Sequence, residues 1–468
     1  MTDRGGLTPA AELVERGLAV ARASRAKGET FVIVSDTFDA DVRFANNTTT
    51  TNGVRRDRSI NVVRILEHDA GKSVGVASGS GPIDIEQLIG AAEADAKGAA
   101  VVDDASELFS GGADVDFADP PKETDLSVYS ALLPDLGAAF ARARASSTLL
   151  SGFFTHAAST AYLGSSTGMR RRVPDASGTF ELVGRADGGA RSAWVGVGTD
   201  DFSDVSLGSF EQKLFERLEW SKRHVDLPAG RYEVILPPDA VADLVLEIYF
   251  AMGGQDAEDG GTVFSAPGGS TRVGERLASL PFVMSSDPHE PSIACPDVFV
   301  TGTSSSDSSV FDNGAPLSRT DWIDDGRLAQ LRYHRAGAIR SGVAFAPAID
   351  NLALEVEGAH RALEDLVAAT EHGLLLTCLW YVREVDPATL LLTGLTRDGV
   401  YLVESGEVVG AVNNFRFNQS PIDVLRDAID VGASERALSR EWGEWMERTK
   451  MPAMRVANFN MSSTSQAS

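Results

Sequence analysis

In the first hundred residues the apolar positions follow a helical spacing, then the alternation of strands, and then a helical spacing again. A helical spacing of apolar residues follows the N-cap dipeptide Thr8-Pro9 and stops before Gly28, which predicts a helix. A second helix is predicted from Asp84, whose spacing to Gln87 is that of a capping box, to about Lys97. Alternating and β-branched runs predict the strands between these helices, at residues 31–34, 41–44, 60–65 and 73–78. This order predicts an α+β N-terminal domain, residues 1–118.

The acidic, Gly-rich segment 109–121 ends in two prolines and is the best linker candidate. Beyond it we predict a central α/β domain, residues 122–226. It contains a helix over 125–145 interrupted near Pro134, strands near 149–156, 179–185 and 193–198, and a helix over 210–220.

From Leu227 onward the chain is rich in β-type runs, so residues 227–468 are predicted to form a β-rich C-terminal domain. The fold class is therefore α+β, with a mixed N-terminal half and a β-rich C-terminal half. The runs lie at 232–236, 298–302, 328–334, 374–382 and 399–405, and one apolar helix is predicted over 239–252.

Charge and cysteine content narrow the function classes. The 468 residues carry a net charge of −25, which would repel a phosphate polyanion, so no nucleic-acid partner is expected. The basic run Arg170-Arg171-Arg172 is interpreted as a solvated strand end. The sequence lacks a signal-peptide pattern and any run of about 18 apolar residues, so no membrane association is expected. Cys295 and Cys378 cannot form a disulfide framework, which favours a cytoplasmic protein.

Histidines and loops that resemble catalytic motifs lack the required context. His289-Glu290 resembles the start of a zinc motif, but Pro291 follows and no histidine lies four or five residues on. A site built from His334, His372 and Glu371 is conceivable, although they lie in separate segments. The segment Gly253-Gly254-Gln255 to Gly260-Gly261 is either a surface loop or a flexible, peptide- or partner-facing rim.

Several separated motifs, in order along some 400 residues, resemble the TldD/PmbA metallopeptidase family. They are Arg43-Phe44-Ala45-Asn46-Asn47, Ala229-Gly230-x-Tyr232, Asp324-Asp325-Gly326-Arg327-Leu328, Asn351-Leu352 with Glu357-Gly358 and Leu366, Glu371-His372-Gly373-Leu374-Leu375 with Val385-Asp386-Pro387, and the segment from Asp398-Gly399 to Gly406-Glu407. D-G and S-G turns are common between strands, so the joint order carries the resemblance.

Catalytic members of that family carry an H-E-x-x-x-H zinc motif on the helix after the Tyr232 strand, and a cysteine ligand near the chain end. The resemblance places the two histidines at Val245 and Phe250, the glutamate at Leu246 and the cysteine at Leu438. No histidine lies between His224 and His289. The resemblance therefore implies no catalytic and no metal residue in this chain, like the PmbA (TldE) branch, and a zinc ion in a TldD-type partner.

Three functions follow from this interpretation. The chain is a non-catalytic subunit of a heterodimeric zinc peptidase for unfolded or short peptides, an autonomous peptide-binding or maturation factor, or an enzyme with relocated catalytic residues. The resemblance favours the first, with a peptide as the substrate of the complex.

Overall fold

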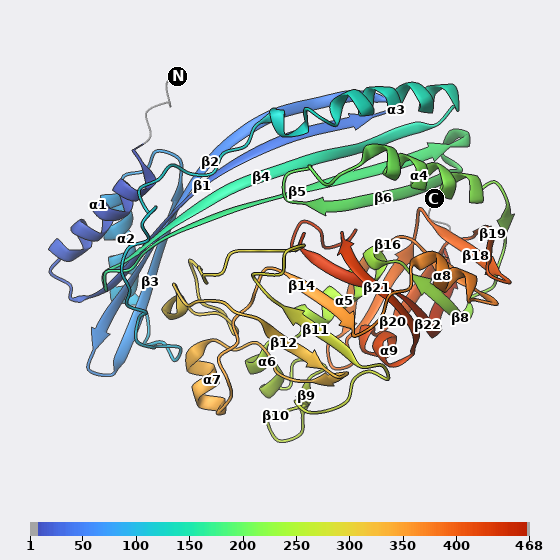
Figure 1. Cartoon of the computed structure of the whole chain (residues 1–468). Coiled ribbons are helices and arrows are strands. Elements are labelled where there is room, and N and C mark those ends of the chain that lie inside the picture. Colours follow the sequence, from blue (N-terminus) through green and yellow to red (C-terminus); the bar gives the residue numbers. More distant parts are fainter. Residues whose placement is uncertain (1–7, 466–468) are drawn as a thin grey trace.

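The computed structural model describes residues 8–465. Six long antiparallel strands form the N-terminal sheet, in the order β3-β2-β1-β4-β5-β6, and it arches over the C-terminal half (Figure 1). The strands are β1 (Gly28–Ala45), β2 (Thr48–His68), β3 (Gly71–Ser80), β4 (Leu149–Ser165), β5 (Arg170–Ala186) and β6 (Arg191–Thr199). Because β1 pairs with β4, the predicted segments 1–118 and 122–226 share one sheet.

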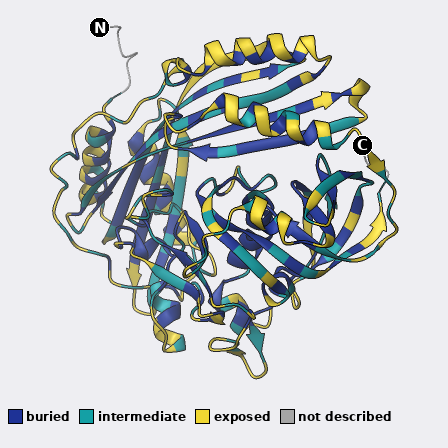
Figure 2. Ribbon diagram, turned by 45° about the vertical axis from the view of Figure 1, so that its right-hand side comes forward, coloured by how far each residue is buried: buried dark blue, intermediate teal, exposed yellow. Residues whose placement is uncertain are grey.

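Helices cover the outer face of this sheet, two at each end, and their own outer sides are exposed (Figure 2). The helices are α1 (Ala10–Ala23), α2 (Ile85–Gly98), α3 (Leu133–Ala145) and α4 (Leu207–Trp220). Helix α1 begins one residue later than predicted, with Pro9 as N-cap. The predicted interruption near Pro134 is present as a turn at residues 130–132, which separates a short 3-10 helix, η1 (Leu126–Tyr129), from α3.

At the end of the sheet that α3 and α4 cover, the alternation of side chains along the strands makes the inner face polar. In β1 the buried Ala40, Val42 and Phe44 pack toward α3 and α4. Side chains of a strand alternate between faces, so Asp41 and Arg43 point the other way, toward the C-terminal half. This part of the inner face can therefore contact charged groups or water.

One edge of the sheet is unpaired over half a strand. Strand β2 pairs with β3 only from Ser59, opposite Ser80, to His68. The preceding segment, Thr48–Asp57, pairs with β1 alone, and every residue in it is exposed. Unpaired strand edges are templates for the addition of another strand.

The C-terminal half contains a large mixed sheet wrapped around the apolar helix α5 (Pro238–Phe250). Its main path runs β13-β12-β11-β14-β22-β8-β15-β18-β19-β7. The strands of this path are β7 (His224–Val225), β8 (Gly230–Leu236), β11 (Phe282–Ser286), β12 (Thr320–Asp324), β13 (Arg327–Leu328), β14 (Leu352–Val356), β15 (His372–Leu376), β18 (Val400–Glu404), β19 (Glu407–Val412) and β22 (Thr449–Thr464).

Further strands branch from β22 or stand apart, and short helices connect them. The strands are β16 (Leu379–Asp386), β17 (Leu391–Thr396), β20 (Phe415–Gln419), β21 (Ala428–Ala437), β9 (Ser265–Ala266) and β10 (Ser270–Thr271). The helices are α6 (Gly254–Glu258), α7 (Arg335–Ser341), α8 (Leu363–Ala368) and α9 (Pro421–Arg426). No helix of residues 8–465 is long and apolar enough to cross a membrane.

The predicted α+β class is confirmed by this mixture of helix and strand. Two predicted strands are wrong. Residues 298–302 form a loop with one isolated bridge, Val298 to Pro316. Of residues 328–334 only Leu328, the end of β13, is in a strand, and Arg332 and Tyr333 form isolated bridges. Apolar side chains in both segments are buried by loop packing rather than by sheet pairing, which a period-two pattern cannot distinguish.

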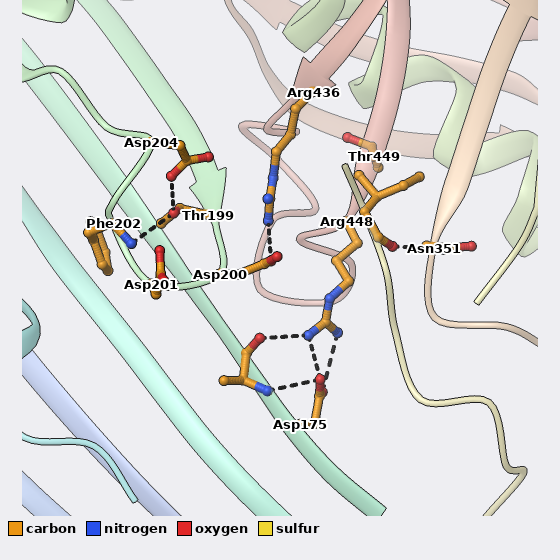
Figure 3. Close-up of polar contacts among 12 residues, drawn as sticks. Asp175, Thr199, Asp200, Asp201, Phe202, Asp204, Asn351, Arg436, Arg448 and Thr449 are labelled. Carbon is orange, nitrogen blue, oxygen red and sulfur yellow. Dashed lines mark hydrogen bonds and ion pairs between the residues drawn. The ribbon is translucent and has the colours of Figure 1, made fainter. Parts of the chain in front are cut away.

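Arginines of one C-terminal segment attach the two halves to each other (Figure 3). Arg448 donates from Nη2 to Asp175 Oδ1 at 2.6 Å and to the Ala176 carbonyl oxygen at 2.9 Å. Arg436 Nη2 donates to Asp200 Oδ1 at 2.9 Å. At the opposite end of the sheet, Ser309 Oγ donates to Asp104 Oδ2 at 2.8 Å, both residues being buried. Contacts near both ends of the sheet thus join the two halves.

We predict that Asp175→Ala destabilises the protein by roughly 3 kcal/mol, because it leaves the buried Arg448 guanidinium without its counter-charge. Urea unfolding followed by circular dichroism measures the change. The matched control is Glu219→Ala, which breaks an exposed pair with Lys222 and should leave the unfolding curve unchanged. Equal unfolding curves for the two variants would contradict the role of the Arg448 pair.

Candidate functional site

Helix α5 is buried on all sides, yet one of its faces is acidic. Every residue from Ala240 to Tyr249 is buried, as expected of a helix that is apolar around most of its circumference. Asp239, Asp243 and Glu247 interrupt that pattern at intervals of four residues, so they follow one another along one face. This acidic stripe was visible in the sequence as D-x-x-x-D-x-x-x-E, but its meaning depends on what packs against it.

The stripe holds the segment 438–448, which connects β21 to β22 and is called here the latch loop. The Leu438 N–H donates to Asp239 Oδ1 at 3.0 Å. Ser439 Oγ and the Glu441 N–H both donate to Asp243 Oδ1, at 2.6 and 2.9 Å. Farther along, the Phe250 ring stands edge-on to Trp442, with ring centroids 5.8 Å apart. The loop therefore runs along the helix from its first turn to its last.

Burial makes these carboxyl groups hard to ionise. Loss of solvation raises the pKa of Asp243 to about 8, opposed by the Glu441 N–H and the Ser439 hydroxyl. Loss of solvation also raises the pKa of Asp239 to about 6, opposed by the Leu438 N–H, and that of Glu247 to about 7, with a further contribution from Glu384. Asp243 Oδ2 is buried and has no hydrogen-bond partner among the described residues. A neutral Asp243 with two donors on Oδ1 satisfies this environment best.

The residues at the family's ligand positions are placed as follows. Val245 and Leu246 lie in the central core, 1% and 0% exposed. Leu438 is also buried, but it packs with Trp194 and Cys378 rather than with the helix core. Phe250, at the end of the helix, is by contrast 37% exposed. Within residues 8–465 no group of three or more His, Cys, Asp or Glu side chains is arranged to hold a metal ion.

The Gly-rich rim predicted after α5 divides into two parts. Gly253 and Gly254 are buried, and a Cβ on Gly254 would lie 2.1 Å from the Tyr333 ring. Gln255 is half-buried, whereas Gly260 and Gly261 are exposed. The first glycines thus serve close packing, and a peptide- or partner-facing role stays a prediction for the exposed part.

The histidines considered in the sequence lie apart. His334 is buried as the N-cap of α7, where its Nδ1 accepts from the Gly337 N–H at 3.1 Å. His372 is exposed on β15, 4.0 Å from Glu404. Burial raises the pKa of the Cys295 thiol to about 12 and that of Cys378 well above its ordinary value, so neither thiol is activated.

A cavity of about 460 Å³ lies between the N-terminal sheet and the latch loop, and it is called here the interdomain cavity. Strands β1, β4, β5 and β16 contribute its walls together with the loop. Its lining residues are Arg43, Phe153, Thr155, Thr179, Glu181, Trp380, Tyr381, Arg383, Leu438, Arg440, Glu441, Gly443, Glu444 and Glu447. Leu438, at the family's cysteine position, is one of them, so the cavity adjoins the place where the resemblance puts the lost metal site.

Arg440 of the latch loop is held in an aromatic and acidic cage beside this cavity. Its guanidinium carbon lies 4.1 Å from the centroid of a Trp380 ring and 5.5 Å from that of Trp194. It pairs with Glu181 at 3.0 Å, and Glu181 also accepts from Trp194 Nε1 at 2.8 Å. Burial raises the pKa of Glu181, opposed by Arg440. The cage fixes the latch loop on the sheet side as Asp243 fixes it on the helix side.

Comparison with known proteins gives one family match. Residues 229–463 match the family model described as the PmbA/TldA metallopeptidase C-terminal domain. No curated protein sequence matches the chain.

Several solved structures share the fold over almost the whole chain. TldE from Thermococcus kodakarensis is 15% identical with a TM-score of 0.74, over 97% of this chain and 99% of that one. A candidate modulator of DNA gyrase from Thermotoga maritima has the same identity and TM-score, over 96% of this chain and 99% of that one. A third, from Bacteroides thetaiotaomicron, is 15% identical with a TM-score of 0.71, over 96% and 98%.

We predict that Asp243→Asn flattens the pH dependence of stability. A carboxyl whose pKa is raised on folding stabilises the fold fully below its unfolded value, near pH 4, and loses that contribution as the pH rises through its folded value near 8. Asparagine keeps the acceptor oxygen but does not titrate. Between pH 5 and pH 8.5 the wild type should therefore lose at least about 1 kcal/mol more unfolding free energy than the variant.

The matched control for this comparison is Asp243→Leu, which removes the acceptor of Ser439 and Glu441 and should destabilise the protein at both pH values. Urea unfolding at pH 5 and pH 8.5 gives all three values. Parallel pH profiles for the wild type and Asp243→Asn would show that Asp243 is not held neutral.

Restoring the zinc motif should fail. The triple variant Val245→His, Leu246→Glu and Phe250→His places polar groups at two fully buried positions, each costing roughly 2–5 kcal/mol. Adding Leu438→Cys should at best give weak zinc binding, since partners that orient the ligands are also needed. Thermal unfolding and zinc titration measure both effects, with the half-exposed Phe250→His alone as the mild control. A triple variant that binds zinc tightly at wild-type stability would contradict the burial argument.

Proposed function

Because the chain belongs to the PmbA/TldD metallopeptidase family, we propose that it is the non-catalytic, TldE-like subunit of a heterodimeric zinc peptidase. Its partner would be a TldD-type subunit that carries the zinc. The complex would act in the cytoplasm on unfolded or short peptides. The fold similarity to TldE from Thermococcus kodakarensis supports this assignment.

The observation that carries the proposal is the burial of apolar side chains at two of the family's three ligand positions, Val245 and Leu438, and at its glutamate position, Leu246. Val245 and Leu246 are core residues of α5, and Leu438 is buried beneath the N-terminal sheet. Imidazole or thiolate groups at these places would need polar partners, which the apolar neighbours do not supply. The helix has thus become a packing element.

Two surfaces support a role in enclosing a peptide. The inner face of the N-terminal sheet is polar near Asp41 and Arg43, where it faces the interdomain cavity. The exposed edge Thr48–Asp57 of β2 offers unpaired backbone groups to an extended segment of a peptide or of the partner subunit. A subunit of this kind would restrict access to the partner's zinc to chains that can be extended.

The alternative is an autonomous peptide-binding or maturation factor that works without hydrolysis. The same edge and cavity would serve it, so the two functions differ only in the need for a zinc-bearing partner. An independent enzyme with relocated residues is the third possibility, and a metal bound by this chain alone would favour it.

We predict that the chain purified alone holds no stoichiometric zinc and cleaves no peptide, whereas the complex captured from its native host contains a TldD-type subunit with one zinc and hydrolyses unfolded peptide. Mass spectrometry identifies the partner, elemental analysis counts the zinc, and a chelator should abolish hydrolysis.

Two results would contradict the subunit role. Capture of bound peptides with no metal-bearing partner would favour the autonomous factor. Chelator-sensitive hydrolysis that follows this chain alone through chromatography would favour the independent enzyme.

A further inference from the structure

The unpaired part of β2 begins where β3 leaves the sheet. The Gly81 N–H donates to the Arg58 carbonyl oxygen at 2.8 Å, and Gly81, with a φ of 78°, then turns the chain away. The Arg58 N–H donates to the Asp57 carboxylate at 2.9 Å. Alternate residues of an antiparallel strand present both backbone groups to the same side, so the N–H and C=O groups of Arg56 and Val54 face the free edge.

The side chains of these residues lie on the outer face of the sheet, which the helices cover. Arg56 stands opposite Phe38 of β1, and its guanidinium carbon lies 4.6 Å from the centroid of the Phe38 ring. Val54, opposite Ala40, is 47% exposed. A strand added antiparallel to β2 would therefore place the side chain opposite Arg56 on this outer face as well.

A cavity of about 410 Å³ lies beside Arg56 and is called here the edge pocket. Helix α1, residues 118–123 and strands β1 and β2 form its walls. Its apolar lining residues are Pro9, Ala10, Phe38, Ala118, Pro120 and Pro121. Gly81 lines it too, so the pocket lies where β3 ends and the free edge begins. Because Arg56, Ala118 and Pro120 are exposed, a ligand can reach it from the solvent.

Both arginines that line the edge pocket are paired with carboxylates. Arg58 binds Asp36 through two buried hydrogen bonds of 2.5 and 2.6 Å. Arg56 pairs with Glu123 at 3.3 Å. These pairs leave neither guanidinium for an anionic ligand, and the apolar walls favour a neutral, apolar group.

We propose that the free edge of β2 binds an extended peptide as an added antiparallel strand, with one large apolar side chain of that peptide in the edge pocket. The peptide residue opposite Arg56 would exchange both backbone hydrogen bonds with it and supply the side chain. A volume of about 410 Å³ holds an aromatic ring. The inference rests on the proposed peptide-binding function, assigns the edge to a peptide and gives it a preference for apolar residues.

Calorimetric titration of the full-length chain tests this preference. The probe is acetyl-Thr-Thr-Phe-Thr-Thr-amide, and the matched peptides carry alanine or lysine in place of phenylalanine. The phenylalanine peptide should bind about tenfold more tightly than either, because the pocket removes its ring from water. Equal affinities of the three peptides, or no binding of the phenylalanine peptide, would overturn the proposal.

Two N-methylated forms of the phenylalanine peptide test the strand pairing. A methyl group on the phenylalanine nitrogen removes the donor to the Arg56 carbonyl oxygen, so it should reduce the affinity about tenfold. A methyl group on the next threonine nitrogen, which faces the solvent, is the matched control and should change little. Equal losses would overturn the antiparallel pairing. Hydrogen exchange should slow at the Val54 and Arg56 amides when the peptide binds, and unchanged exchange there would contradict the assigned edge.

A pair of variants tests the pocket. Ala118→Trp fills it from its exposed rim and should reduce the affinity for the phenylalanine peptide to that for the alanine peptide. Ala94→Trp, on the exposed side of α2, is the matched control and should change neither. Unfolding midpoints show that both variants are folded. Equal affinities of the two variants for the phenylalanine peptide would overturn the pocket assignment.

Sedimentation distinguishes a peptide from a second copy of the chain. A chain that is dimeric alone and becomes monomeric with the phenylalanine peptide would assign the edge to a second copy and overturn the peptide as its occupant. Binding without a change of oligomeric state supports the proposal. Assembly with a zinc-bearing partner is measured separately, so a failed apolar preference leaves the subunit proposal intact, and a missing partner leaves the preference to be decided by calorimetry.

Discussion

The hydrogen bonds that Asp239 and Asp243 accept from the latch loop are the interaction on which the rest of the C-terminal half depends. They fix a loop of otherwise irregular backbone on a helix that is buried on every side. Catalytic relatives are expected to join the same helix and chain end through a metal. Here buried carboxyl groups make the connection through hydrogen bonds, and burial raises the pKa of Asp239 to about 6 and that of Asp243 to about 8.

The latch loop also binds the N-terminal half of the molecule. Arg440 and Arg448 extend from the loop to Glu181 and Asp175 on β5, and Arg436 reaches Asp200 from the adjoining end of β21. Close backbone approach adds to these contacts, because a Cβ at Gly198 would lie 2.6 Å from the Glu447 carbonyl oxygen. The position of the N-terminal sheet, and with it the interdomain cavity, is therefore set by the same loop that the α5 carboxyl groups hold.

The sequence allowed the prediction of features that depend on local periodicity. Helix α5, the two N-terminal helices and the α+β class follow from patterns of apolar residues and caps. The two strands predicted at 31–34 and 41–44 are parts of one long strand, β1. Its alternation continues between them through polar residues that face the other domain. The strand at 298–302 was wrong since loop packing buries the same kind of side chain.

The candidate site was only partly predictable. Its family and the apolar ligand positions are visible in the residues, and the family is confirmed. The contacts of the acidic stripe and the Arg440 cage are not, because each depends on which distant segment packs against it. Trp194, Trp380 and Arg440 lie on three elements far apart in sequence, and no spacing rule links them.

Hydrogen exchange of residues 438–448, followed by mass spectrometry with and without a zinc chelator, tests the central claim most directly. The account predicts that these amides are protected from exchange in the chain alone, that the chelator changes nothing, and that Asp243→Leu exposes the Leu438 and Glu441 amides to exchange. Protection that disappears on chelation, or that persists in Asp243→Leu, would show that a metal or another contact holds the loop.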